Sequence, residues 1–344
     1  MKVAVVFNEP YKELIDPYAI KCTPEFCNND VFKLRGCDII AEYELIAKNL
    51  RLFGYDSYIL NILDNLDVLL NDLNINKPDI IFNLIEIYKD KAGLEKNFAS
   101  VFELMKIPFT GATSKSLALC QNKYLSKQIL SENNILVPSF QNVNSINNNF
   151  LLKVNFPIIV KPVSEDGSIG IDDDSVINDY DNLITKISEL HNRFKQPVII
   201  EEFIDGREIN VSLLEIDEIV VLPISEIDFS NMPSNYNKIV GFNAKWNSEH
   251  ECYKKTIPVC PANLIPEIEV KAKEIAIKCF SVLNCRGYAR VDMRIDKNGN
   301  IFVLEVNPNP DLSIDAGFFR AAKVHGYSYN KLLEIIVKNA KTKA

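Results

Sequence analysis

Residues 288–313 read Y-A-R-V-D-M-R-I-D-K-N-G-N-I-F-V-L-E-V-N-P-N-P-D-L-S, two runs of alternating polar and apolar residues that meet at Asn298-Gly299. An Asn-Gly pair between such runs predicts a β-hairpin, because a type I′ turn needs positive φ at both central positions. Side chains along a strand alternate between two faces, so this two-residue turn also fixes which residues share a face. The apolar face pairs Val291 with Val306, Met293 with Leu304 and Ile295 with Phe302. The polar face carries Arg290, Asp292, Arg294, Glu305 and Asn307.

The polar face brings two carboxylates together. The predicted register places Asp292 opposite Glu305 and Arg290 opposite Asn307. Carboxylates that face each other across a strand pair repel, so a cation is expected between them. That cation is either an arginine in an ordinary surface ion pair or a metal ion. Two carboxylates and a carboxamide oxygen form the set that Mg²⁺ binds when substrate phosphates supply its other ligands.

This stretch, R-V-D-M-R-I-D followed by L-E-V-N-P-N-P, resembles the metal-binding end of the ATP-grasp superfamily and is most similar to enzymes like D-alanine:D-alanine ligase. The resemblance implies an α/β fold with a three-domain ATP-grasp architecture. An N-terminal Rossmann-like parallel-sheet domain would precede two α+β domains that grip ATP. It further implies that Asp292, Glu305 and Asn307 hold two Mg²⁺ ions on ATP, with Mn²⁺ as an alternative ion. Arg290 would stabilise the acyl-phosphate and the tetrahedral intermediate.

Length and composition limit the kind of partner. A chain of 344 residues is long enough for two or three domains, and 47% apolar with 24% charged residues is ordinary for globular proteins. The formal net charge of −8 argues against nucleic-acid binding, which needs clustered Lys and Arg. No run approaches the roughly 20 apolar residues of a membrane span, and residues 1–7 are too short for a signal sequence. We expect a cytoplasmic protein with small-molecule carboxylate and amine substrates and no nucleic-acid or membrane partner. Whether it forms a homodimer stays open.

The cysteines and histidines do not form a recognisable site. The eight cysteines contain no C-x-x-C pair. A zinc site at Cys22, Cys27 and Cys37 is the alternative, but their spacing fits no usual ligand pattern, so reduced thiols are expected. The three histidines lie far apart, without the local sequence of an activated serine or cysteine. The sequence therefore gives no support to a Ser-His or Cys-His mechanism.

The first third of the chain alternates strands and helices. Residues 2–7 and 79–85 are apolar runs typical of buried strands, and residues 38–53 have helical spacing with Gly54 as the C-cap. This alternation predicts a parallel sheet. No G-x-G-x-x-G follows the first strand, so dinucleotide binding is not expected there.

A short segment that resembles the ligase family marks the expected end of the first domain. The segment I-P-F-T-G at residues 107–111 resembles the I-P-Y-T-G that closes the first domain in the ligase family. After it, Ser114 is expected to cap a helix that runs through residue 131. The expected domains are residues 1–112, 113–205 and 206–344.

Two lysines and a loop are candidate phosphate contacts. Lys123 lies in Q-N-K-Y-L-S-K, which resembles the D-K-x-x-x-K of the family, although a solvent-exposed helix lysine is the alternative. Lys161 ends the apolar strand at residues 156–162, and a buried lysine needs an anion as its partner. The loop E-D-G-S-I-G that follows would let backbone N–H groups approach a phosphate, although glycine and serine also make ordinary turns. The candidate phosphate-binding residues of this loop are Gly167, Ser168 and Gly170.

Residues 197–214 predict two strands with a break at Asp205-Gly206. In the ATP-grasp family this segment is the hinge over the adenine. The resemblance implies that backbone groups of residues 201–204 read the edge of the base and that a carboxylate accepts from the ribose. A plain hairpin with its two consecutive glutamates in solvent is the alternative. The implied nucleotide contacts are Glu201, Phe203, Ile204 and Glu208.

Residues 230–256 are polar and show little periodicity. A structureless stretch of this length inside a compact domain is usually functional, so we expect a lid over the nucleotide. Lys245 lies where the ligase family has a loop lysine that reaches the γ-phosphate. A surface lysine beside the chain's only tryptophan is the alternative. Helices are expected at residues 267–283 and 330–340.

The motifs for the amino-acid substrates depart from the family. The family's E-x-E-V-S-L is not matched by residues 8–14, and its H-G-x-x-G-E-D-G loop is replaced by residues 85–93. The family's N-x-x-P-G-M-T reads N-P-N-P-D-L-S here, which puts Asp311 beside the expected oxyanion position. Its carboxylate would repel a substrate carboxylate and fill space, unless it turns outward and caps the following turn.

These observations lead to one functional hypothesis with three alternatives. We expect an ATP- and Mg-dependent carboxylate–amine ligase that forms an amide or peptide bond through an acyl-phosphate, with altered substrate specificity. Charge neutralisation on the triphosphate and positive charge at the oxyanion would carry the chemistry, so no protein nucleophile is needed. The alternatives are an authentic D-alanine:D-alanine ligase, a carboxylase-type ATP-grasp enzyme and a non-catalytic nucleotide sensor.

Overall fold

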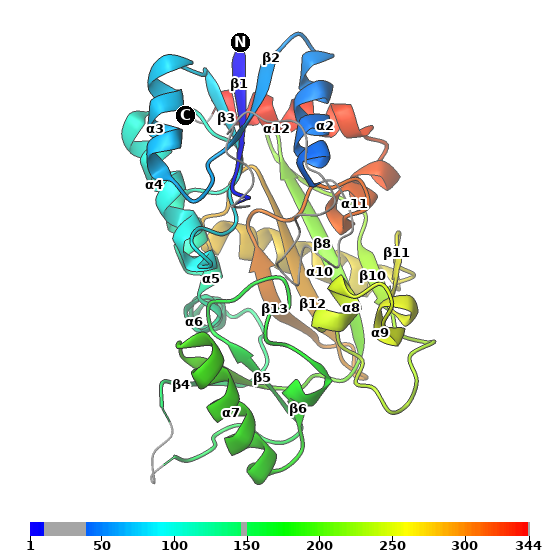
Figure 1. Ribbon diagram of the computed structural model, residues 1–344. Coiled ribbons are helices and arrows are strands. Elements are labelled where there is room, and N and C mark those ends of the chain that lie inside the picture. Colours follow the sequence, from blue (N-terminus) through cyan, green and yellow to red (C-terminus); the bar gives the residue numbers. More distant parts are fainter. Residues whose placement is uncertain (10–38, 146–149, 343–344) are drawn as a thin grey trace.

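The computed structural model describes residues 1–9, 39–145 and 150–342. Its strands form three sheets stacked along the long axis of the molecule, with the N-terminal sheet at one end (Figure 1). The three cysteines considered for a zinc site, Cys22, Cys27 and Cys37, lie outside the described residues. Across the described parts of the chain, no helix is both long and apolar enough to span a membrane.

The first sheet is parallel, as the alternation predicts, with the strand order β2-β1-β3. Its strands are β1 (Lys2–Phe7), β2 (Asp56–Asn61) and β3 (Ile80–Leu84). Alternate residues of β1 enter two separate cores, because a strand buried on both faces needs cover on each side. Val3 and Val5 pack with α2 (Ile39–Arg51), α11 (Gly317–His325) and α12 (Tyr329–Thr342). Ala4 and Val6 pack with α3 (Leu66–Ile75) and α4 (Glu95–Met105).

The helix expected from Ser114 through residue 131 is broken in two. The first part, α5 (Ser114–Gln121), is capped by the side chain of Thr113 rather than by Ser114. Asn122 ends α5 in an extended conformation and caps α6 (Lys123–Glu132) by accepting from the N–H of Leu125. Such a cap satisfies an N–H group that has no partner within the helix, and this stabilises the break. Lys123 therefore stands at the start of a helix, and its N–H donates to the carbonyl of Val163 at 3.0 Å.

The second sheet is antiparallel, in the order β4-β7-β5-β6, and α7 (Tyr180–Phe194) packs on it (Figure 1). Its strands are β4 (Phe140–Val143), β5 (Ile158–Pro162), β6 (Val176–Ile177) and β7 (Val198–Glu202). The expected break at residues 205–206 separates β7 from β8, the first strand of the third sheet. The two sheets are thereby joined at the predicted hinge.

The third sheet is also antiparallel and runs β11-β10-β8-β12-β13, with β9 paired to β8. The expected helix at residues 267–283 is α10 (Pro266–Val282), which packs on this sheet. The stretch 230–256 is not structureless, since it contains the short helices α8 (Phe242–Trp246) and α9 (Glu251–Lys255). The strands are β8 (Arg207–Glu215), β9 (Ile219–Val221), β10 (Ser225–Asp228), β11 (Ile257–Val259), β12 (Tyr288–Ile295) and β13 (Ile301–Asn307).

The hairpin of β12 and β13 has the expected register only at the end away from its turn. Asp292 pairs with Glu305 and Arg290 with Asn307, as predicted. Beyond a bulge, Leu304 is an extra residue on β13, and Met293 pairs with Val303 instead. The pairings of Met293 with Leu304 and of Ile295 with Phe302 are therefore wrong.

The turn of this hairpin also differs from the expected type I′. The N–H of Gly299 donates to the carbonyl of Asp296 at 3.0 Å, which closes a longer turn. Gly299 alone in this turn has positive φ, at +81°. The side chain of Asp296 stabilises this conformation, because its Oδ1 accepts from the N–H groups of Asn298 and Asn300, each at 2.8 Å.

Candidate active site

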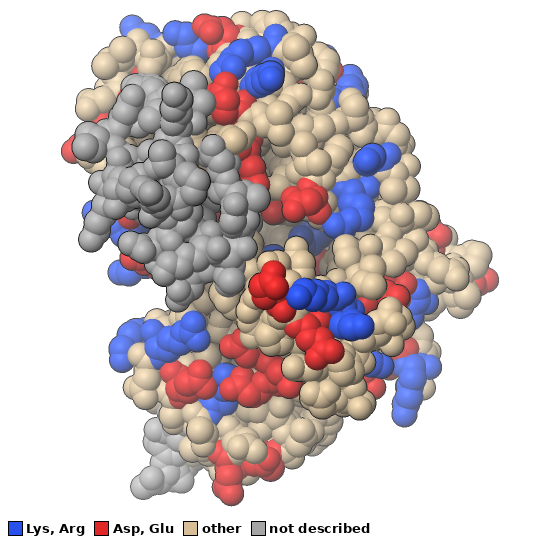
Figure 2. Space-filling model, turned by 45° about the vertical axis from the view of Figure 1, so that its right-hand side comes forward, with Lys and Arg blue, Asp and Glu red and all other residues tan. Residues whose placement is uncertain are grey.

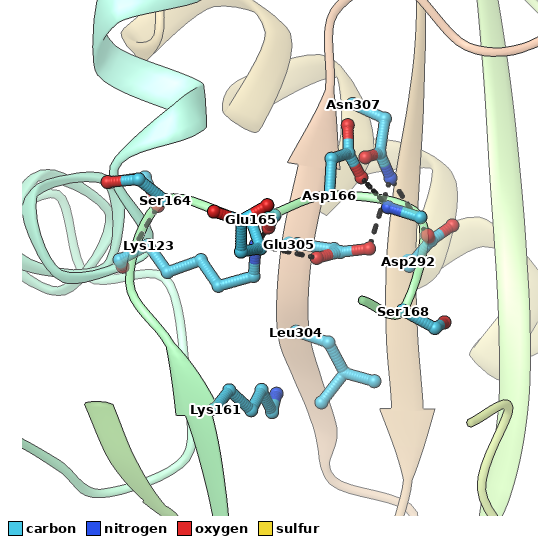
Figure 3. Close-up of polar contacts among 12 residues, drawn as sticks. Lys123, Lys161, Ser164, Glu165, Asp166, Ser168, Asp292, Leu304, Glu305 and Asn307 are labelled. Atoms are coloured by element: carbon cyan, nitrogen blue, oxygen red, sulfur yellow. Dashed lines mark hydrogen bonds and ion pairs between the residues drawn. The ribbon is translucent and has the colours of Figure 1, made fainter. Parts of the chain in front are cut away.

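Two carboxylates face each other across β12 and β13. Figure 3 shows Asp292 and Glu305 on neighbouring strands beneath the loop that follows β5. Arg290 makes a two-bond ion pair with Asp292, from Nε to Oδ1 and from Nη2 to Oδ2, each at 2.7 Å. An arginine, one of the two cations expected beside the carboxylates, is therefore present in the fold.

The same cluster fits the ligand set of a magnesium ion. Asp292 is buried and also accepts from Asn307 Nδ2 at 2.9 Å, while the same nitrogen lies 3.4 Å from Glu305 Oε1. Rotating this carboxamide by half a turn would offer Oδ1 to a metal beside two carboxylates. No group of three or more His, Cys, Asp or Glu side chains suited to a metal occurs among the described residues. Phosphate oxygens would have to complete the coordination.

Glu305 is the point on which the predicted cations converge. Burial tends to raise the pKa of its carboxyl group, but nearby cations outweigh burial and lower it to about 2. Lys123 contributes most and lies 3.9 Å away, from Nζ to Oε2. The cations that act on Glu305 are Lys123, Lys161, Arg290 and Lys245. Four basic residues from four separate segments therefore act on one carboxylate, and such a concentration of positive charge is suited to a polyanionic ligand.

The anion that Lys161 needs is Glu201. Its Oε2 accepts from Lys161 at 3.0 Å and also lies 3.3 Å from the Nζ of Lys127, so two ammonium groups share one oxygen. Burial opposes ionisation of Glu201, but Lys127 and then Lys161 hold its pKa below the usual value. Its other oxygen, Oε1, is buried with no hydrogen-bond partner in the described structure. An unpaired buried acceptor of this kind fits a ligand that donates N–H groups, such as an adenine.

Lys127 is a site residue that the sequence analysis missed. It is almost fully buried, and burial lowers its pKa to about 8. The signal was present in Q-N-K-Y-L-S-K, where this second lysine follows Lys123 by four residues and so lies on the same side of the helix.

The glycine loop after β5 folds down over these charges. Gly167, Ser168 and Gly170 all have positive φ, between +62° and +76°. A Cβ added at Gly170 would lie only 2.8 Å from Phe194 and Pro162, so close packing also requires glycine there. Lys123 donates from Nζ to the carbonyl of Glu165. Beneath the loop is a cavity of about 30 Å³, room for a water molecule or two but not for a triphosphate.

The expected lid is docked on this loop. Trp246 Nε1 donates to the carbonyl of Gly167 at 2.7 Å, and Ser168 Oγ donates to the carbonyl of Val240 at 2.7 Å. Lys245 is exposed, with its Nζ 5.2 Å from the centre of the Trp246 ring. Lys245 therefore has the environment of a surface lysine, which is the stated alternative. Its charge also contributes to lowering the pKa of Glu305. Figure 2 shows a recess near the middle of the face in view, with basic side chains inside it.

The hinge residues are organised by Arg294, whose role the sequence did not reveal. Its guanidinium donates to Glu208 Oε2 at 2.8 Å and to the carbonyl of Ile204 at 2.8 Å, and it lies 5.1 Å from the Phe203 ring. Burial raises the pKa of Glu208, and Arg294 opposes that effect. The N–H of Phe203 is bonded to Pro157, so only part of this backbone is free to read a base.

Known proteins resemble this chain in both sequence and fold. The family model described as "D-ala D-ala ligase C-terminus" matches residues 134–338, more than half of the chain. The chain belongs to the D-alanine–D-alanine ligase family. A D-alanine–D-alanine ligase of Carboxydothermus hydrogenoformans is 30% identical over 275 residues, covering 76% of this chain and 82% of that protein. The uncharacterized protein y4sG of Sinorhizobium fredii is 28% identical over 258 residues, covering 75% and 73%.

A solved structure shows the same fold. The D-alanine–D-alanine ligase of Bacillus anthracis, complexed with ATP, gives a TM-score of 0.74 over 99% of this chain and 97% of that one, at 22% identity. The expected three-domain ATP-grasp fold is thereby confirmed, while the domain boundaries stay predictions. Membership of the D-alanine–D-alanine ligase family also confirms the class, an ATP-grasp ligase that uses ATP and acts on small molecules.

Asp311, which replaces a glycine of the D-alanine–D-alanine ligase family motif, is bonded to the turn that follows it. Asp311 is exposed, and its Oδ1 accepts from the N–H of Ser313 at 2.8 Å and from its hydroxyl at 2.6 Å. This side chain caps the following turn, as the stated alternative expects. Its effect on a substrate carboxylate stays a prediction.

The segment after β13 is tied to the first domain by Asn309. Its Nδ2 donates to Glu95 Oε1 at 2.8 Å, and its Oδ1 accepts from the N–H of Ala112 at 2.9 Å. Glu95 is buried, and burial raises its pKa to about 8. A Cβ at Gly111 would lie 2.4 Å from the Asn309 amide oxygen, so glycine is required at that position. No local sequence pattern predicts this contact, because Asn309 and Glu95 are 214 residues apart in the chain.

Proposed function

We propose that this protein is an ATP- and Mg²⁺-dependent carboxylate–amine ligase that forms an amide or peptide bond through an acyl-phosphate, with substrates other than two molecules of D-alanine. The observation that carries the proposal is the pair of facing carboxylates, with Lys123 3.9 Å from Glu305 and Arg290 2.7 Å from Asp292. Phosphoryl transfer depends on neutralising charge at the transferred group, and this cluster has the charges to do so.

The nucleotide would lie between the second and third sheets. The unpaired Oε1 of Glu201 supports contact with the amino group of the base, and Phe203 and Ile204 supply its apolar surroundings. Glu208 would accept from the ribose while keeping its pair with Arg294. The triphosphate would lie against Lys123 and Lys161. Its other contacts would come from Gly167, Ser168 and Gly170.

The metal ions on the triphosphate would be held by Asp292, Glu305 and Asn307. Two Mg²⁺ ions, or Mn²⁺ in their place, would neutralise the triphosphate there. Arg290 stays beside Asp292 and directs its positive charge toward the oxygen that becomes negative as the amine attacks. Lys245 on the lid would add its charge at the γ-phosphate.

The proposed chemistry has two steps. A carboxylate oxygen of the first substrate attacks the γ-phosphorus, the bond to the β-phosphate oxygen breaks, and ADP leaves. The amine of the second substrate then attacks the acyl carbon, phosphate leaves, and the amine loses a proton. Lys123, Lys161 and Arg290 remain in place through both steps and neutralise the charge that moves.

The altered specificity is supported by residues that follow the strands of the first sheet. In α/β sheets, ligands bind at the carboxyl ends of parallel strands. Here Glu9 follows β1 and Glu86 follows β3, and both replace family motifs for the amino-acid substrates. The rewritten segments, rather than their charge, support a substrate other than D-alanine. Genuine D-alanine–D-alanine ligase activity is the second candidate, favoured by the names of the relatives.

A screen of ADP release tests the proposal. Purified protein with ATP and Mg²⁺ would receive D-alanine alone, pairs of amino acids, small carboxylates with amines, and bicarbonate. ADP release with one carboxylate–amine pair, together with an amide product detected by mass, supports the ligase. Release with bicarbonate alone would identify a carboxylase-type enzyme instead. ATP binding without turnover on any substrate would favour the nucleotide sensor.

A further inference from the structure

Lys127 connects two sheets that lie on opposite sides of the nucleotide site. Its side chain is about 1% exposed. Its Nζ donates to the carbonyl of Leu304 on β13 at 2.7 Å and lies 3.3 Å from Glu201 Oε2 on β7. One ammonium group thus touches the carboxylate at the base end of the site and the backbone beside the metal end.

Leu304 is the residue that makes the β13 bulge. In an unbroken strand, inward positions recur at every second residue, so Ile301 and Val303 would be followed by residue 305. The observed burial departs from this, because Val306 is buried and Glu305 is only partly buried. The extra residue therefore turns Glu305 from the core side to the polar side, opposite Asp292. Without the bulge the pair of facing carboxylates would not exist.

We infer that Lys127 is a positioning residue for Glu305: by binding the Leu304 carbonyl it holds the bulge that aims this carboxylate at the metal site. The inference rests on the proposed magnesium site. Through Glu201, the same ammonium group ties the bulge to the part of the site that would hold the base. A bulge leaves a residue unpaired in the strand ladder, so a donor from outside the sheet is needed to satisfy its carbonyl.

A purely electrostatic role and a positioning role of Lys127 predict opposite effects of its removal on Mg²⁺ binding. Taking a cation away from a site that binds Mg²⁺ should strengthen metal binding, because like charges repel. Taking away a positioning group should weaken it, because the bulge relaxes and Glu305 loses its direction. The sign of the change therefore separates the two roles.

The experiment measures how much Mg²⁺ tightens the binding of AMP-PNP. Titration calorimetry with and without Mg²⁺ gives the ratio of the two dissociation constants for each variant. We expect Lys127→Met to reduce this ratio at least about fivefold relative to wild type, and Lys127→Arg, which keeps N–H donors, to reduce it less. Lys186→Met is the matched control. That lysine is also buried and pairs with two carboxylates, Asp174 and Glu189, so its loss should leave the ratio unchanged.

A double variant tests whether Lys127 acts through Glu305. If it does, adding Lys127→Met to Glu305→Gln should change the ratio little further, whereas independent effects would multiply. An unchanged or larger ratio in Lys127→Met, or multiplied effects, would overturn the inference. A wild-type protein whose AMP-PNP binding ignores Mg²⁺ would overturn the magnesium assignment, and this inference with it. If Lys127→Met does not fold, Lys127→Leu, which also lacks a donor, gives the same comparison.

Discussion

Asp292 and Glu305 occupy directly opposite positions on β12 and β13, so neighbouring strands present two carboxylates to one site. Arg290 is paired with the first, and lysines from three other segments act on the second. The cluster therefore presents charges of both signs: in the proposed reaction the two acids would hold metal ions and the surrounding bases would contact phosphates.

Glu305→Gln should reduce turnover by at least about two orders of magnitude, because the carboxylate would help to hold the ions that neutralise the triphosphate. The fold should persist, since Glu305 is only partly buried and Gln has nearly its shape. Steady-state ADP release across a range of Mg²⁺ concentrations checks this, with circular dichroism as the control for folding. Wild-type turnover at every concentration would remove Glu305 from the metal site.

The lid and the glycine loop should move together when nucleotide binds. The 30 Å³ cavity below the loop cannot hold a triphosphate, and Trp246 is bonded to Gly167 on that loop. AMP-PNP with Mg²⁺ should therefore change the fluorescence of Trp246, the only tryptophan. It should also slow proteolysis within residues 230–256 as nucleotide contacts hold the lid.

Trp246→Phe is the control for this contact, since it keeps an aromatic ring but removes the N–H donor. Cleavage of the lid should be faster in this variant without nucleotide. Equal cleavage of the wild-type lid with and without AMP-PNP would count against coupled movement.

Glu95→Gln should make stability less dependent on pH. Burial raises the folded pKa of Glu95 to about 8 from an ordinary value of 4.5. The folded state therefore holds a proton that the unfolded state releases, and this contribution is complete below pH 4.5 and lost as the pH rises through 8. Gln carries no such proton. Relative to wild type, the variant should gain about 1–3 kcal/mol between pH 5 and pH 9, since each pKa unit corresponds to roughly 1.4 kcal/mol.

Urea unfolding of both proteins at pH 5, 7 and 9 measures this difference directly. Effects of other titrating groups cancel in the comparison, because they are shared. A difference that stays constant over this range would show that Glu95 is ionised in the folded protein at neutral pH.

D-Alanine alone should give little ADP release. Residues 8–14 and 85–93 replace the family's two amino-acid motifs after the first-sheet strands, so the contacts that those motifs make with D-alanine are not expected here. An amine-bearing or larger partner should restore release. Rapid formation of D-alanyl-D-alanine, detected by mass spectrometry, would contradict the prediction and establish the second candidate function.

The facing carboxylates could be predicted from sequence although the hairpin was wrong in two places. The actual turn is longer than the expected two residues, which shifts the register by one at Ile295. The bulge at Leu304 shifts it back, so Asp292 still meets Glu305. The turn follows from bonds to Asp296, a local signal. The bulge is bound by Lys127, 177 residues away, and no local pattern shows that contact.

Other parts of the site were missed for the same reason. Lys123, Lys161 and the glycine loop lie in short motifs, so their residue types reveal them. Arg294 and Asn309 act through partners far along the chain, at Glu208 and Glu95. Local patterns predict which elements form, whereas the choice of partner depends on how those elements pack.

The packing of α11 and α12 on the first sheet has a consequence for how the chain is made. α11 and α12, which cover Val3 and Val5 together with α2, follow β1 by more than 300 residues, so they leave the ribosome long after it. Until then part of one face of that sheet stays open to water, and the core around β1 is completed only when these two helices have been made. A fragment that stops before residue 317 should accordingly need a chaperone, or aggregate.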